Sequence, residues 1–225
     1  MKRLASILVA ICALVPAAYA ADAPAKPAAT PKTAAPAKPA PAVVDSLALL
    51  ERAVAKDSTK FETLYRLGVM YLDRERMQEA SRVLWKANEL KPHNVHVLVN
   101  LGVALDAVGH ADDAQGFYKE ALKVAPGDSV ALCRLASSIY AQGKYNESVN
   151  MLRELIKSKP RSYCAYFTMG VAFADAGIYR DAIRMWRKVV EIAPESPEGQ
   201  AAKRGLDGIA AAHQGAPGST PATNQ

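Results

Sequence analysis

The feature that most constrains the fold of this chain is a repeat with a period of 34 residues. Four pairs that combine a large apolar residue with a small one recur at this spacing, as do four prolines. The pairs are Leu67-Gly68, Leu101-Gly102, Leu135-Ala136 and Met169-Gly170, and the prolines are Pro92, Pro126, Pro160 and Pro194. A fixed period of this length predicts a row of small supersecondary units that bury their apolar faces against one another.

Each unit holds two helical stretches. In the second unit Leu98, Leu101 and Leu105 lie on one face at helical spacing, and Tyr118 faces them from the stretch that follows. Small residues recur where two such helices must approach most closely, because side chains have to pack there without overlap. These residues are Gly68, Gly102, Ala136 and Gly170 in the first helices and Ala80, Ala114, Ser148 and Ala182 in the second. The pattern predicts an all-α chain of antiparallel helix pairs.

Glycine and proline mark the turns. Three units carry a glycine in the turn between the paired helices, at Gly109, Gly143 and Gly177, and the recurring prolines end each second helix. These glycines permit a left-handed backbone conformation. Glu75 stands at the same turn in the first unit, so we expect that turn to use no positive φ.

The period and the residues within it resemble the tetratricopeptide repeat. Four windows match that family's pattern at nearly all of its characteristic positions, although Leu155 and Val189 stand where the family usually has alanine. The windows are residues 61–94, 95–128, 129–162 and 163–196. The resemblance implies a right-handed α-solenoid of four tetratricopeptide repeats.

The array is expected to begin and end outside the full repeats. Residues 43–60 keep the phase of a second helix, which predicts an N-terminal half-repeat helix. Ser196 as N-cap and Pro197 at the first helical position predict a capping helix over residues 197–213. Such end pieces are needed because the apolar face of a terminal repeat would otherwise meet water.

The first 42 residues are typical of export and tethering. A basic start, an apolar run and a small-residue cleavage sequence ending at Ala20 predict a signal peptide over residues 1–20. The apolar run is shorter than the ~20 residues of a spanning helix, so we expect no integral membrane span after cleavage. Residues 21–42 predict an Ala/Pro/Lys-rich linker and residues 214–225 a disordered tail. The expected location is periplasmic or secreted.

The net charge does not indicate nucleic-acid binding. The formal charge of the chain is +6, but the signal peptide and the linker each carry +2, which leaves +2 for residues 43–213. A nucleic-acid site needs a concentrated basic surface. We therefore expect a protein or peptide partner and no nucleic acid.

The sequence contains no recognisable catalytic or cofactor motif. It lacks G-x-S-x-G, P-loop, H-E-x-x-H and G-x-G-x-x-G patterns. His93 and His96 are close in sequence, but they straddle a repeat junction without neighbouring cysteine or carboxylate ligands, which favours surface histidines over a metal site. We expect a protein that is not an enzyme and has no cofactor or metal.

The family resemblance implies a concave groove lined by fixed positions of each first helix. Those positions hold Tyr65, Arg66, Val69, Leu72, His96, Val99, Asn100, Val103, Cys133, Arg134, Tyr140, Cys164, Phe167 and Val171. This mainly apolar set favours an amphipathic helix or extended peptide, with Arg66 and Arg134 available for a carboxylate. Alternatively, some of the valines only pack between neighbouring first helices. Only Asn100 and Arg134 match the two-carboxylate clamp of chaperone-binding members, so that ligand is disfavoured.

Two cysteines remain once residues 1–20 are removed. The repeat phase puts Cys133 and Cys164 on the concave side of neighbouring first helices, and an exported protein meets oxidising conditions. They form a candidate disulfide. The alternative is a pair of small apolar residues that fill the core or the groove.

Three functional interpretations follow. The favoured one is a non-enzymatic periplasmic adaptor that holds a peptide or partner subunit in its groove, as exported bacterial members of the resembled family do in cell-envelope complex assembly. The second is a tethered structural spacer, which shortening of the linker would impair and mutation of the groove would not. The third is a thiol- or redox-active protein using Cys133 and Cys164, although no C-x-x-C motif supports it.

Overall fold

The computed structural model describes residues 46–214, and within that range every regular element is an α-helix. The helices are α2 (Ser46–Lys56), α3 (Phe61–Asp73), α4 (Met77–Leu90), α5 (Val95–Ala107), α6 (Ala111–Val124), α7 (Ser129–Ala141), α8 (Tyr145–Ser158), α9 (Tyr163–Asp175), α10 (Tyr179–Ile192) and α11 (Pro197–Gln214). The all-α prediction is therefore confirmed for this part of the chain. The signal peptide predicted at 1–20, the linker at 21–42 and residues 215–225 of the predicted tail lie outside the described residues.

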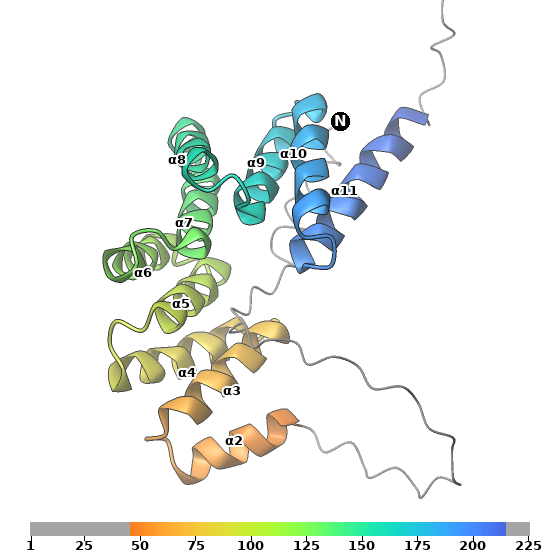
Figure 1. Ribbon diagram of the computed structural model, residues 1–225. Coiled ribbons are helices and arrows are strands. Elements are labelled where there is room, and N and C mark those ends of the chain that lie inside the picture. The colour runs from red at the N-terminus through yellow and green to blue at the C-terminus, as the bar shows by residue number, and fades with distance from the viewer. Residues whose placement is uncertain (1–45, 215–225) are drawn as a thin grey trace, which may run out of the picture.

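The helices stack in chain order as a curved solenoid (Figure 1). Helices α3, α5, α7 and α9 are the first helices of the four repeats, and α4, α6, α8 and α10 are the second helices. Each first helix contacts the next one along the array, whereas successive second helices of the described chain make no contact of comparable extent. The first helices therefore lie on the inner side of the curve, as Figure 1 shows for α5 and α7 with α6 and α8 outside them.

Small residues set the distance between the paired helices, as the sequence predicts. A Cβ atom added to Gly102 would overlap the Tyr118 ring, and one added to Gly170 would lie 2.5 Å from the Trp186 ring. Both aromatic side chains are fully buried against the glycine backbone. Any larger residue at these two positions would force the helices apart.

The turns are alike in all four repeats, and the expectation for Glu75 is wrong. Gly109, Gly143 and Gly177 have φ angles of 89°, 80° and 75°, and Glu75 has a φ of 58° in the corresponding turn. The reason is the hydrogen bonding: the amide of Arg76 donates to the Tyr71 carbonyl, as the residue after each turn glycine does in its own repeat. The closed turn imposes the left-handed conformation whatever side chain stands there.

The two ends are covered as expected. Helix α2 packs on α3, and Glu51 of α2 accepts hydrogen bonds from the Tyr71 hydroxyl at 2.8 Å and from Arg76 at 3.1 Å. At the other end, the Ser196 hydroxyl oxygen accepts from the Gly199 amide at 2.9 Å, which is the N-cap bond predicted for the capping helix. That helix, α11, ends at Gln214, one residue beyond the predicted boundary.

Candidate binding face

The candidate site is the inner face formed by the first helices. Eight of the groove residues implied by the family resemblance are exposed or half-buried there. They are Tyr65, Arg66, Val69, His96, Val103, Arg134, Tyr140 and Cys164. We refer to these eight side chains as the inner face. They come from all four repeats and combine aromatic, aliphatic and basic groups.

The other six predicted groove residues are buried, so they do not line an open surface. They are Leu72, Val99, Asn100, Cys133, Phe167 and Val171. Leu72 packs in the core of the first repeat with Leu84, and Val99 packs between α5 and α7. The alternative that a valine only fills the contact between neighbouring first helices is thus correct for Val99.

Phe167 and Val171 are buried for a different reason. Both belong to one apolar cluster with Ala202 and Ile209 of the capping helix α11. Helix α11 contacts α9 as well as α10, and it covers Phe167 and Val171, so that of the predicted groove residues of the fourth repeat only Cys164 belongs to the inner face. The apolar stripe of the capping helix is visible in the sequence, but its effect on the groove depends on where that helix docks.

Asn100 is held below the surface by a neighbouring repeat. Its side-chain amide donates a hydrogen bond of 3.3 Å to the Tyr65 hydroxyl, and the side chain is fully buried. Asn100 therefore positions the Tyr65 ring at the inner face and makes no surface of its own. Its place in the clamp pattern does not make it accessible to a ligand.

A polar cluster that the sequence does not reveal joins the second and third repeats. Asp106 accepts hydrogen bonds from the Tyr118 hydroxyl at 3.0 Å and from the Ser138 hydroxyl at 2.8 Å. Gln115 in turn donates to the Ser138 oxygen at 3.3 Å. Burial raises the pKa of Asp106, against the two hydrogen bonds and the positive charge of Arg134, which lower it. Arg134 thus faces a carboxylate of its own chain.

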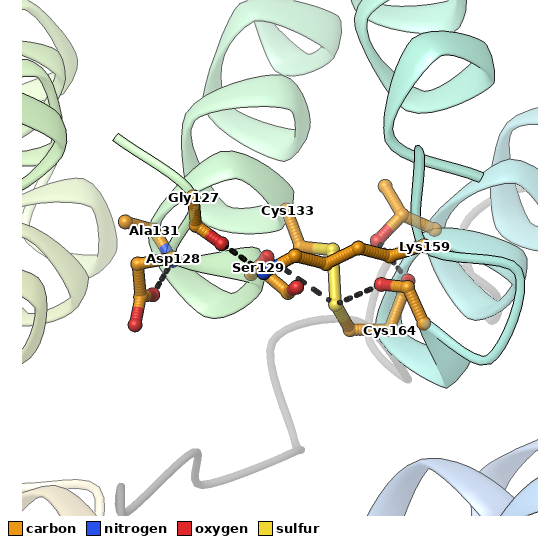
Figure 2. Close-up of a disulfide and its surroundings, with 9 residues drawn as sticks. Gly127, Asp128, Ser129, Ala131, Cys133, Lys159 and Cys164 are labelled. Atoms are coloured by element: carbon orange, nitrogen blue, oxygen red, sulfur yellow. Dashed lines mark hydrogen bonds between the residues drawn. A yellow bond between two sulfur atoms is a disulfide. The ribbon is translucent and has the colours of Figure 1, made fainter. Parts of the chain in front are cut away.

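Cys133 and Cys164 are joined by a disulfide between α7 and α9 (Figure 2). Their Cα atoms are 6.2 Å apart, within the range that such a bond spans. Cys133 is buried and Cys164 is half-buried. Close by, the Lys159 ammonium group donates to the Gly127 carbonyl, so a second contact links the loop before α7 to the loop before α9.

The described residues hold no group of three or more His, Cys, Asp or Glu side chains arranged to bind a metal ion. The Nδ1 atom of His93 lies 3.0 Å from a carboxylate oxygen of Glu120. The sequence does not indicate this neighbour, because the repeat geometry brings Glu120 close from a distant part of the chain. Within residues 46–214 none of the helices combines the length and apolar character that a bilayer crossing requires.

Comparison with known proteins concerns the repeat architecture. A family model described as tetratrico peptide repeat matches residues 95–204. The crystal structure of MamA shares 22% identity with this chain, covers 70% of it and 89% of its own length, and gives a TM-score of 0.53. TTC0263, a thermophilic tetratricopeptide protein of Thermus thermophilus, shares 17% identity over 71% of this chain and 88% of its own, with a TM-score of 0.60. No curated protein matches in sequence.

At these identities the two structures show likeness of fold alone. The family match nevertheless spans three of the four windows of the 34-residue period, and the helix pairs of the structure follow that period from Phe61 to Ile192. The sequence pattern, the packing and the family match therefore agree. The chain is a member of the tetratricopeptide-repeat family.

Proposed function

We propose that this protein is a non-enzymatic adaptor that holds a peptide segment or a partner subunit against its inner face. The observation that carries the proposal is the mixed character of that face. Val69 and Val103 are half-buried and offer apolar contact, while Arg66 is exposed and offers a charged hydrogen-bond donor. A curved solenoid presents such a surface over several repeats at once, which suits an elongated ligand.

The ligand contacts are divided between the two arginines in a way that the sequence does not suggest. Arg66 is exposed and accessible to a carboxylate of a partner. Arg134 is half-buried and acts on Asp106, so its charge is partly committed within the array. We therefore assign the main charged contact to Arg66.

The proposal extends to the place of action. The predicted signal peptide favours export to the periplasm, and the predicted linker would leave the solenoid free to reach partners in cell-envelope complexes. Fractionation of cells, with N-terminal sequencing of the mature protein, tests this part separately from binding. A cytoplasmic, uncleaved protein would contradict it.

Site-specific crosslinking tests the binding face. A photoreactive residue is placed at Val69 or Val103 in cells, and a matched control is placed at Arg187, which is exposed on the second helix α10. The proposal expects the same crosslinked species from Val69 and Val103 and none from Arg187. Equal or stronger crosslinking from Arg187 would move the binding surface to the outer side of the curve.

A charge reversal supplies an independent test. Arg66→Glu is expected to weaken capture of the crosslinked partner without lowering the melting temperature, because the side chain is exposed. Arg187→Glu is the control, since it changes the charge equally on the outer side. Unchanged capture by Arg66→Glu would show that Arg66 is not a ligand contact.

A further inference from the structure

The disulfide occupies a place that other repeats fill without a covalent bond. Cys133 and Cys164 are 31 residues apart. The same register pairs Val99 of α5 with Val130 of α7 at the preceding junction. Val99 and Val130 belong to one apolar cluster, so side-chain packing is enough to hold two neighbouring first helices at this register. The bond at the next junction therefore adds a chemical property that the architecture itself does not require.

The two sulfur atoms have unequal surroundings. Cys133 is only 5% exposed and packs among apolar side chains that include Leu152, Leu155 and Met169. Cys164 is half-buried and belongs to the inner face. A reagent from solution therefore meets Cys164 first, and burial in apolar surroundings disfavours a thiolate at Cys133.

Cys164 is the second residue of α9, at the positive end of the helix dipole. Ser162, which precedes α9, differs from the residues that precede α5 and α7. The side chains of Asn94 and Asp128, at the same repeat position, cap their helices by accepting from backbone amides. The Ser162 side chain makes no such cap bond, and its hydroxyl lies 3.4 Å from the Cys164 sulfur.

These surroundings stabilise negative charge on the Cys164 sulfur. The helix N-terminus favours a thiolate, and a serine hydroxyl can donate a hydrogen bond to it. The Ser129 carbonyl oxygen, also 3.4 Å from the sulfur, gives the neutral thiol an acceptor and acts in the opposite direction. Two groups thus favour the thiolate and one favours the thiol.

We propose that Cys133 and Cys164 form a thiol–disulfide exchange site, in which Cys164 is the exchanging sulfur and Cys133 the resolving one. The reaction partner is a thiol, either a small molecule such as glutathione or a cysteine of a protein. In the reducing direction its thiolate attacks Cys164, a mixed disulfide forms on Cys164, and the bond to Cys133 breaks. Cys133 leaves as a thiolate and takes up a proton. A second thiolate then attacks the external sulfur of the mixed disulfide, which releases the Cys164 thiolate and one external disulfide.

The oxidising direction follows the same path in reverse. The Cys164 thiolate attacks an external disulfide, forms the mixed disulfide and releases one thiolate. Cys133 then loses its proton and attacks Cys164, which closes the internal bond and releases the second thiolate. Two cysteine thiols and one external disulfide become one internal disulfide and two external thiols. This site does not depend on the proposed partner binding.

The two single variants have replacements taken from the chain itself. Cys133→Val introduces the residue found at Val99, and Cys164→Val introduces the residue found at Val130. Each variant is incubated with oxidised glutathione, and the protein–glutathione adduct is followed by mass spectrometry. Cys133→Val is expected to form its adduct about tenfold faster than Cys164→Val, because its remaining sulfur is the accessible one. A ratio below about threefold, or no adduct on Cys133→Val, overturns the proposal.

A second measurement separates thiolate stabilisation from mere exposure. The rate of iodoacetamide alkylation of Cys133→Val is measured against pH, and the expected apparent pKa of Cys164 lies below the ~8.5 of an unperturbed thiol. A value at or above that overturns the assignment of Cys164 as the exchanging sulfur. Ser162→Ala in the same background should raise the apparent pKa, whereas the exposed Ser158→Ala should not.

The wild-type protein provides the measurement that needs no variant to fold. It is reduced with excess glutathione and quenched with acid at early times, and the peptides carrying glutathione are identified. Glutathione on Cys164 is expected to predominate. Glutathione mainly on Cys133 would reverse the two roles and overturn the proposal.

Discussion

The junction between the second and third repeats and the junction between the third and fourth repeats solve the same packing problem with different chemistry. At the first junction Val99 packs against residues of α7, and the Asp128 side chain caps α7 by accepting a hydrogen bond from the Ala131 amide at 2.7 Å. The second uses the disulfide, and Ser162 leaves its helix without a side-chain cap. The position of one first helix against the next is therefore not set by any single residue type.

The repeats at these two junctions pack their paired helices in the same way. Gly102 meets Tyr118 in one repeat and Gly170 meets Trp186 in another, and both repeats close their turn with a residue at positive φ. These contacts leave little freedom, because a methyl group is already too large for them. The residues that join successive repeats are less constrained, so they can carry caps, polar clusters or a disulfide.

The largest expected effect comes from making the two junctions alike. The double variant Cys133→Val with Cys164→Val should lose roughly 3–4 kcal/mol of unfolding free energy, the entropic contribution of a bond that closes a loop of this length. Chemical denaturation of the variant and of the wild type, with and without reductant, measures this loss. Identical midpoints under all conditions would mean that packing alone holds the second junction.

The next effect tests what the repeats share. Gly102→Leu should destabilise by about 1–3 kcal/mol, because the new side chain must enter the space of the Tyr118 ring. Gly116→Ala is the control, since a Cβ there meets no atom within 4 Å. Urea denaturation followed by helical circular dichroism compares them. A Gly102→Leu variant as stable as wild type would show that the helices can separate at low cost.

A smaller effect separates the helix caps. Asp128→Ala should cost about 1 kcal/mol, because the Ala131 amide loses its acceptor. Ser162→Ala should cost clearly less, since the Ser162 side chain makes no cap bond. Thermal melting of the two variants under oxidising conditions checks the difference. Equal losses would mean that Ser162 also stabilises its helix.

The smallest effect is a pH dependence confined to the first of the two junctions. Because burial raises the pKa of Asp106 in the folded state, this group's contribution to stability is complete below the ordinary carboxyl pKa and is lost as pH rises through the higher folded pKa. The free energy of unfolding of the wild type, relative to that of Asp106→Asn, should therefore decrease as pH rises across that window. Denaturation curves at several pH values measure it, and a constant difference would contradict the raised pKa.

The fold was predictable because its determinants are repeated. Gly68, Gly102 and Gly170 recur at the repeat spacing, and so do the four prolines. The sequence therefore indicates the same helix pair four times, and the repeat boundaries follow from the sequence alone. The half-repeat and capping helices also continue this phase and differ from the structure by a few residues at most. The positive φ of Glu75 was not predicted, because only the hydrogen bonding of the turn reveals it.

The site was predictable only in outline. Repeat phase assigns a residue to the inner side of a helix, but its accessibility depends on how closely the next helix approaches and on where α11 docks. Val99 and Phe167 are buried for these two reasons, whereas Val69 stays half-buried. The Asp106 cluster was not predictable because its partners come from α6 and α7, and no local pattern indicates that they meet.

The position of the capping helix limits what a ligand can look like. Because α11 covers Phe167 and Val171, the accessible track along the first helices stops at α9. An elongated ligand would therefore be blocked at α9 and would meet the exposed Arg66 toward the other end of the track, so these two ends are chemically distinct. Such a track would distinguish the two directions in which a peptide can bind. It would also set a maximum length for the segment in contact, so the solenoid would select ligands by length as well as bind them.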